Sequence, residues 1–165
     1  MRTLALVRHA KSSWDQPGVD DHERTLNERG RRDAPRMAER LALDHPELRG
    51  AALLSSTARR AATTAEFFAA ALGTTAHLEE SLYGASPARI IAAVSGRSEP
   101  AVIVVAHDPG LSDLARHWSR FPGDDGIPHM PTCAVAVFAF AADDWTGLGD
   151  ALPESWTYDI PRDAD

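Results

Sequence analysis

The chain has 165 residues, of which 44% are hydrophobic and 25% charged, and its formal net charge at pH 7 is −7. This length and composition suffice for one globular domain with its own core, so we expect a single domain over residues 1–165. The acidic balance argues against a general nucleic-acid surface, and no apolar run approaches the roughly 20 residues that cross a membrane.

The first half of the chain alternates short apolar runs with helical patterns. We predict, in chain order, a strand over 3–7, a helix over 27–43, a strand over 51–55, a helix over 60–72 and a strand over 75–78. The first helix has its small and apolar residues on one face and ends before His45-Pro46. Gly73 is placed to close the second helix, as glycine commonly does.

The second half continues the same alternation. We predict a helix that begins after Ser86 and runs through 94, a strand over 101–106, a helix over 111–118 and strands over 133–140 and 155–160. Ser86-Pro87 has the pattern of an N-cap followed by proline in the first turn. The uninterrupted Val/Ile run of 101–106 is typical of a parallel sheet covered on both faces. Strands that alternate with helices predict a three-layer α/β/α sandwich with a mostly parallel central sheet.

Several predicted strands are followed by basic side chains. In chain order these are Arg8 and His9, then Arg60, then His107. Because the carboxyl ends of parallel strands meet at one edge of a sheet, where α/β folds bind their ligands, we expect these side chains to converge.

Cations gathered at one point indicate an anion between them, because bringing them together in a protein interior is otherwise costly. Arginine offers planar, bidentate donors that match phosphate oxygens, and the amides that open the helix after Ser56 can add to such a site. Phosphate is therefore favoured over carboxylate or sulfate as the ligand.

Three segments resemble the motifs of the histidine phosphatase (phosphoglycerate mutase-like) superfamily. The Arg-His signature is matched by LVRHA at residues 6–10, the second-arginine motif by STARRAATTA at 56–65, and the second-histidine motif by VAHDPGL at 105–111. Together with KSSW at 11–14, RTLNERG at 24–30 and the short chain, they make the SixA-type phosphohistidine phosphatases the branch that the sequence resembles most.

This resemblance implies a phosphoglycerate mutase-like fold and a covalent mechanism. One imidazole nitrogen of His9 attacks phosphorus, the other donates to a backbone carbonyl, and the phosphohistidine is then hydrolysed. Arg8, Arg60 and a protonated His107 would bind the phosphoryl oxygens. The reaction would need no metal and no cofactor.

The resemblance leaves the general acid open. Superfamily enzymes that cleave phosphate esters carry a carboxylate between the second and third motifs, and Glu79 and Glu80 lie in that interval. An alkoxide is about as basic as hydroxide, since water has a pKa of about 15.7. Protonated imidazole, in contrast, loses its proton near roughly 6.5, so it leaves without strong assistance. The substrate expected is therefore phosphohistidine on a protein.

Two other functions remain open from the sequence. The first is a broad phosphomonoesterase or mutase that acts on a small phosphorylated metabolite, with Glu80 or Glu79 as the acid. The second is a phosphate- or phosphoprotein-binding module without turnover, which the intact His9 disfavours.

Most residues around the predicted site are given structural rather than catalytic roles. The acidic loop over 15–23 is expected to be solvated rather than to rim the pocket, and Arg59 to lie on the surface. Ser12 and Ser13 either donate to phosphate or form a turn, without preference. Trp14 deserves notice because it follows the predicted nucleophile closely.

The protein is expected to be cytoplasmic. Its N-terminal residues hold too few apolar positions before the first charges to form a secretory signal. The lone Cys133 cannot form an internal disulfide, and its apolar sequence neighbours predict burial rather than reactivity. The remaining histidines outside the motifs show no metal-ligand spacing, so no metal site is expected.

Overall fold

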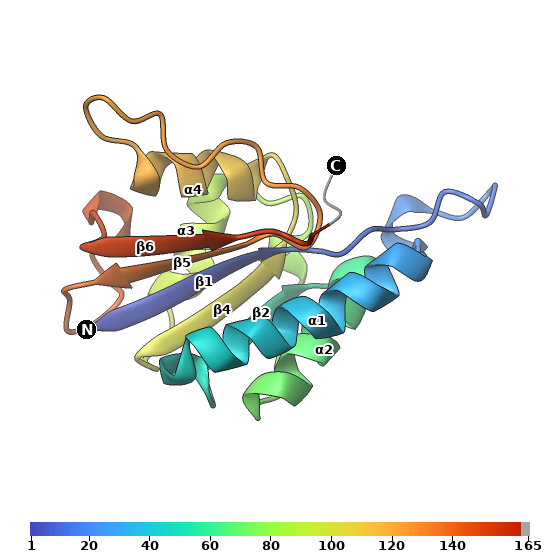
Figure 1. The fold of residues 1–165 in the computed structure, drawn as a ribbon, viewed down its shortest axis with the longest axis horizontal. Coiled ribbons are helices and arrows are strands. Elements are labelled where there is room, and N and C mark those ends of the chain that lie inside the picture. The colour runs from blue at the N-terminus through green and yellow to red at the C-terminus, as the bar shows by residue number, and fades with distance from the viewer. Residues whose placement is uncertain (163–165) are drawn as a thin grey trace.

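The computed structural model describes residues 1–162, and Figure 1 shows their fold. Its helices and strands are β1 (Arg2–Arg8), α1 (Glu28–Asp44), β2 (Ala52–Ser56), α2 (Arg59–Leu72), β3 (Ala76–Glu79), α3 (Pro87–Ser95), β4 (Ala101–Ala106), α4 (Gly110–Ser119), β5 (Val135–Phe140) and β6 (Ser155–Asp159). Each corresponds to a predicted element, with ends that differ by at most two residues.

The strands form one sheet in the order β3-β2-β4-β1-β5-β6. Pairing is parallel from β3 to β1, and β5 runs antiparallel to both β1 and β6. The prediction of a mostly parallel central sheet is therefore confirmed. Because β1 and β4 are paired in register, Arg8 at the end of β1 lies opposite Ala106 at the end of β4.

Helices cover both faces of the sheet, as the alternating pattern predicts. Figure 1 shows α1 and α2 on one side and α3 and α4 on the other. The first core cluster joins Ile103 of β4 to Phe68 of α2, and the second joins Val104 to Leu114 of α4. Successive residues of β4 thus point to opposite faces, and the whole strand is buried. The three-layer sandwich is confirmed.

Local sequence signals account for most element ends. The Asn27 side chain accepts a hydrogen bond from the Gly30 amide at the start of α1, and Gly73 ends α2 in a left-handed conformation. The strand expected from residue 133 begins only at Val135, because Cys133 has a φ of 63°, which is incompatible with an extended strand. Within the described residues, no helix is both long and apolar enough to pass through a bilayer.

Candidate active site

His9 follows β1 and is buried at the carboxyl edge of the sheet. Its Nδ1 lies 2.8 Å from the carbonyl oxygen of Ala10. Because a carbonyl can only accept, Nδ1 carries the proton and Nε2 keeps its lone pair. Burial lowers the pKa of His9 to about 3, and the neighbouring His107, Arg60 and Arg8 also lower it. His9 is therefore neutral near pH 7, as a nucleophile must be.

A pocket of about 240 Å³ opens beside His9. It is lined by Arg8, His9, Lys11, Ser12, Trp14, Arg24, Arg60, His107, Asp108 and Thr132. The ring centroids of His9 and His107 are 5.1 Å apart. The four residues predicted to converge at the carboxyl edge thus share one small pocket.

His107 follows β4, and its Nε2 forms a 2.7 Å hydrogen bond with Oγ of Ser56 at the end of β2. Burial lowers the pKa of His107 to about 4, Arg60 and Arg8 lower it further, and Asp21 opposes them. Desolvation thus outweighs the nearby carboxylate, and the protonated His107 stays an expectation for the site with phosphate bound. A phosphoryl dianion in the pocket would raise this pKa by direct charge attraction.

The two arginines of the predicted site are anchored from outside the pocket. Arg8 donates through Nη1 to the Met130 carbonyl at 2.8 Å, and Arg60 donates through Nη1 and Nη2 to Asp21 at 2.7 and 3.0 Å. Within residues 1–162, Nε of both arginines and Oγ1 of Thr132 are buried without a hydrogen-bond partner. A buried polar group without a partner costs about 1–3 kcal/mol, so this pattern is typical of a site that a ligand completes.

Glycine allows the loop after His9 to lie close to α1. A Cβ added to Gly30, in the first turn of the helix, would stand 2.2 Å from the Lys11 carbonyl oxygen. The Asn27 amide donates to the same carbonyl at 3.0 Å. The RTLNERG segment therefore positions Lys11 and Ser12 at the pocket wall.

The acidic loop is largely exposed, as expected, but its second half also contacts residues beside the pocket. Asp21 contacts Arg60 and Arg24, and Tyr83 donates to the Asp21 carboxylate at 2.6 Å. His22 lies 2.9 Å from Oγ1 of Thr57. Sequence reasoning missed Asp21, Arg24 and Tyr83. The one available signal was that Asp21 stands three residues before Arg24, within the SixA-like part of the chain.

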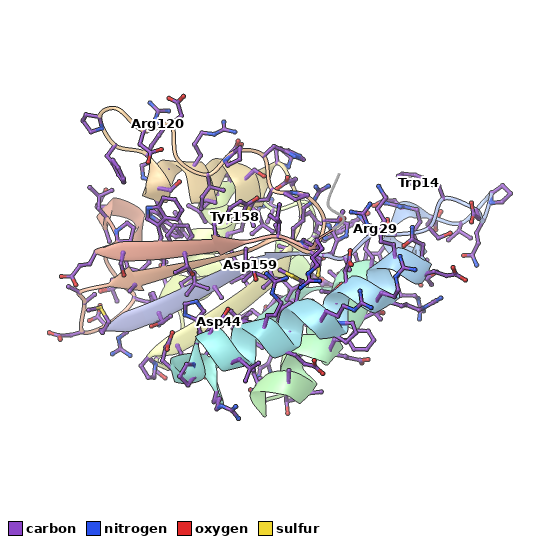
Figure 2. The ribbon with its side chains drawn as sticks, in the orientation of Figure 1. Trp14, Arg29, Asp44, Arg120, Tyr158 and Asp159 are labelled. Carbon is purple, nitrogen blue, oxygen red and sulfur yellow. The ribbon has the colours of Figure 1, made fainter. Side chains whose placement is uncertain are left out.

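The residues next to His9 divide between pocket and surface. Ser12 is buried at the pocket wall and accepts a 2.6 Å hydrogen bond from Arg24, whereas Ser13 accepts from the Asp15 amide in a local turn. Trp14 is 74% exposed, with the Arg24 guanidinium 3.6 Å from its ring centroid. Figure 2 shows Trp14 projecting from the loop that follows β1. Arg59 is exposed and pairs with Glu23, as expected of a surface residue.

Glu79 and Glu80 are not among the residues that line the pocket. Glu79 is the last residue of β3, and its charge adds to that of Glu99 in raising the pKa of Arg97. Glu80 opens the short 3-10 helix Glu80–Leu82 and is exposed. Tyr83 follows this helix and contacts a residue of the site: its ring centroid lies 5.6 Å from that of His107.

Acidification is expected to destabilise the fold through His9. The folded-state pKa is about 3, against 6.5 for an ordinary histidine, so the unfolded chain binds more protons between these values. The stability due to neutral His9 is complete above pH 6.5 and is lost as the pH falls toward 3. The loss by pH 5 is at most about 2 kcal/mol, at roughly 1.4 kcal/mol per pH unit.

Urea unfolding of the wild type and of His9→Gln at pH 7 and pH 5 measures this effect. The variant lacks the titrating group, so its free energy of unfolding should fall less than that of the wild type. An identical fall in both proteins would contradict the buried, neutral state of His9.

The chain is similar to known proteins in both sequence and structure. The profile of the histidine phosphatase superfamily (branch 1) matches residues 4–86, about half of the chain. A protein from Nakamurella multipartitia, assigned as the phosphohistidine phosphatase SixA, has a similar structure, with a TM-score of 0.79 and 25% identity over 98% of this chain and 96% of that one. Its counterpart from Agrobacterium tumefaciens gives a TM-score of 0.74 and 26% identity over 97% and 98% of the two chains.

The fold is also that of the protein histidine phosphatase SixA in its complex with tungstate. The TM-score is 0.70, with 21% identity over 96% of this chain and 94% of that one. No curated protein matches the sequence significantly. The phosphoglycerate mutase-like architecture expected from the motifs is thereby confirmed.

Proposed function

Because the chain belongs to the histidine phosphatase superfamily, we propose that it is a phosphohistidine phosphatase that transfers the phosphoryl group of a protein to its own His9. The observation that carries the proposal is the shared pocket of a neutral His9, His107, Arg8 and Arg60. Similarity to the two SixA structures at 25% and 26% identity supports the choice of branch.

In the proposed reaction, the lone pair on Nε2 of His9 forms a bond to phosphorus while the bond from phosphorus to the substrate nitrogen breaks. The substrate ring, protonated on its other nitrogen, leaves with that electron pair as neutral imidazole. Water then attacks the phosphorus of phospho-His9, which releases inorganic phosphate and restores the imidazole. Arg8 and Arg60 stabilise the charge on the equatorial oxygens, the main source of catalysis in phosphoryl transfer. The reaction uses no metal and no cofactor.

The carboxylates near the pocket favour a leaving group that needs little protonation. The hydrogen bond from Tyr83 is the largest cause that lowers the pKa of Asp21 to about 2, so Asp21 is ionised and cannot donate a proton. Asp108 accepts from both the amide and the hydroxyl of Ser112. A phosphohistidine ring protonated on its other nitrogen leaves as neutral imidazole, whose conjugate acid has a pKa near roughly 6.5, so it needs little help from an acid, whereas an alkoxide does.

A substrate panel tests the substrate class. The wild type should act on a phosphohistidine-bearing protein with a kcat/KM at least about tenfold higher than on an alkyl phosphate ester such as glycerol 2-phosphate, because the alkoxide leaving group of the ester has no acid to protonate it. Glu80→Gln and Glu79→Gln should keep wild-type activity on both. A faster reaction with the ester, lost selectively in either variant, would instead support a phosphomonoesterase or mutase.

The same assay decides between an enzyme and a binding module, because phosphate binding without phosphate release would indicate the latter. The partner proposed is a phosphorylated protein, with a small phosphorylated metabolite as the alternative. The cytoplasmic location and the lack of nucleic-acid or membrane partners stay predictions from the sequence.

A further inference from the structure

We propose that Asp21 is a positioning residue for the proposed phosphatase reaction, because its carboxylate bridges Arg60 and Arg24 and so fixes both guanidiniums at the phosphate pocket. The proposal rests on the proposed function and assigns a role to an acidic residue beside an anion site, where a carboxylate is otherwise unfavourable.

Each carboxylate oxygen of Asp21 serves a different arginine. Oδ2 accepts from Nη2 of Arg60 at 3.0 Å and from the Tyr83 hydroxyl at 2.6 Å. Oδ1 accepts from Nε of Arg24 at 3.2 Å and lies 3.2 Å from its Nη2. The backbone carbonyl of Asp21 also accepts a hydrogen bond from Nη1 of Arg60 at 2.7 Å. Arg24 and Arg60, distant in sequence, are thus held by one residue.

Asp21 lies on the solvent side of Arg60. The Arg60 side chain is 7% exposed, whereas that of Asp21 is 52% exposed. The two terminal nitrogens of Arg60 are engaged with Asp21, while its Nε is buried and has no partner within residues 1–162. Asp21 therefore restrains the end of the guanidinium from outside the pocket and does not take the place of a phosphoryl group beside His9.

The charges around the pocket agree with this role. The lining contains four cationic side chains, Arg8, Lys11, Arg24 and Arg60, and one carboxylate, Asp108. With Asp21 bonded to two of the arginines, and both histidines neutral, the excess is two positive charges. A phosphoryl group carries about −1.5 to −2 at neutral pH, so the excess suits a dianion when Asp21 is ionised.

The experiment compares Asp21→Asn with Asp20→Asn. The first removes the charge but keeps the size of the side chain. The second changes a neighbouring exposed carboxylate that makes no capping hydrogen bond. For Asp21→Asn we expect a kcat on a phosphohistidine-bearing protein about 10- to 100-fold lower, with KM changed less than about threefold. Asp20→Asn should match the wild type, and Asp21→Glu should recover part of the lost kcat.

A second readout does not depend on turnover. In ¹⁵N-labelled protein, the Nε–H group of Arg24 and the Nη–H groups of Arg60, which donate to Asp21, should exchange with water faster in Asp21→Asn than in the wild type or Asp20→Asn. A kcat that is unchanged or higher in Asp21→Asn, or an exchange rate that does not rise, overturns the positioning role. A wild type that never releases phosphate refutes the proposed function instead, and the exchange rates then judge the role of Asp21 alone.

Discussion

His9→Ala is expected to lower kcat for a phosphohistidine-bearing protein by at least about 10⁴-fold, since loss of a covalent nucleophile is among the most damaging changes to an enzyme. Nδ1 of His9 is tied to the Ala10 carbonyl, so Nε2 is the nitrogen that can attack phosphorus. The neighbouring His107 cannot replace it, because its Nε2 is engaged with Ser56. Phosphate release under saturating substrate measures the effect.

The matched control is His77→Ala, which removes an exposed histidine of β3 outside the pocket. It should keep wild-type kcat. Turnover by His9→Ala at the wild-type rate would eliminate the covalent mechanism, whatever the behaviour of the control.

Arg60→Lys should lower kcat by about 10²- to 10³-fold, the usual cost of removing a preorganised donor to developing charge. Lysine keeps the positive charge but loses the planar fork that Arg60 uses to hold Asp21 with two nitrogens while presenting Nε. The expected loss is thus one of geometry rather than of charge. Steady-state kinetics on the phosphohistidine-bearing protein test it.

The adjacent residue supplies the control. Arg59 is 58% exposed and pairs with Glu23 on the surface, so Arg59→Lys should remain within about twofold of the wild type, as exposed ion pairs contribute little. Equal losses in the two variants, or activity of Arg60→Lys within threefold of the wild type, would remove Arg60 from the phosphate-binding set.

The convergence of Arg8, His9, Arg60 and His107 could be predicted because it follows from sheet topology. The Val/Ile run of β4 identifies a parallel strand, and parallel strands end at one edge. The order of residues in the sequence then places Arg8 and His9 at the end of β1 and His107 after β4.

The Asp21 contacts could not be predicted in the same way. A run of acidic residues is normally a solvated surface, and its sequence does not show which cation it meets after folding. Arg60, Arg24 and Tyr83 come from three separate segments, and only their packing creates a site for the Asp21 carboxylate.

Position along the chain was likewise not enough to identify the general acid. Glu79 and Glu80 lie in the expected interval between motifs, but the interval does not fix where their side chains point. The end of β3 and the short 3-10 helix leave both outside the pocket lining and bring Tyr83 toward His107. Local geometry also decided the start of β5, where the left-handed Cys133 delays the strand.

Burial that suits His9 for catalysis also carries a cost. Burial removes the water that would stabilise a protonated His9 ring and so lowers its pKa to about 3. The site therefore stabilises only the neutral imidazole. The neutral nucleophile and the cationic arginines around it are consequently compatible, since no like charge is added to the pocket.

The most direct test of the account is to trap the phosphorylated enzyme. Wild-type protein is mixed with a phosphodonor for less than one turnover, quenched in alkali to preserve phosphohistidine, digested and analysed by mass spectrometry. We predict acid-labile phosphate on the peptide that contains His9, and none there in His9→Ala. Complete phosphate release by the wild type without labelling of His9 at any time point would contradict the mechanism.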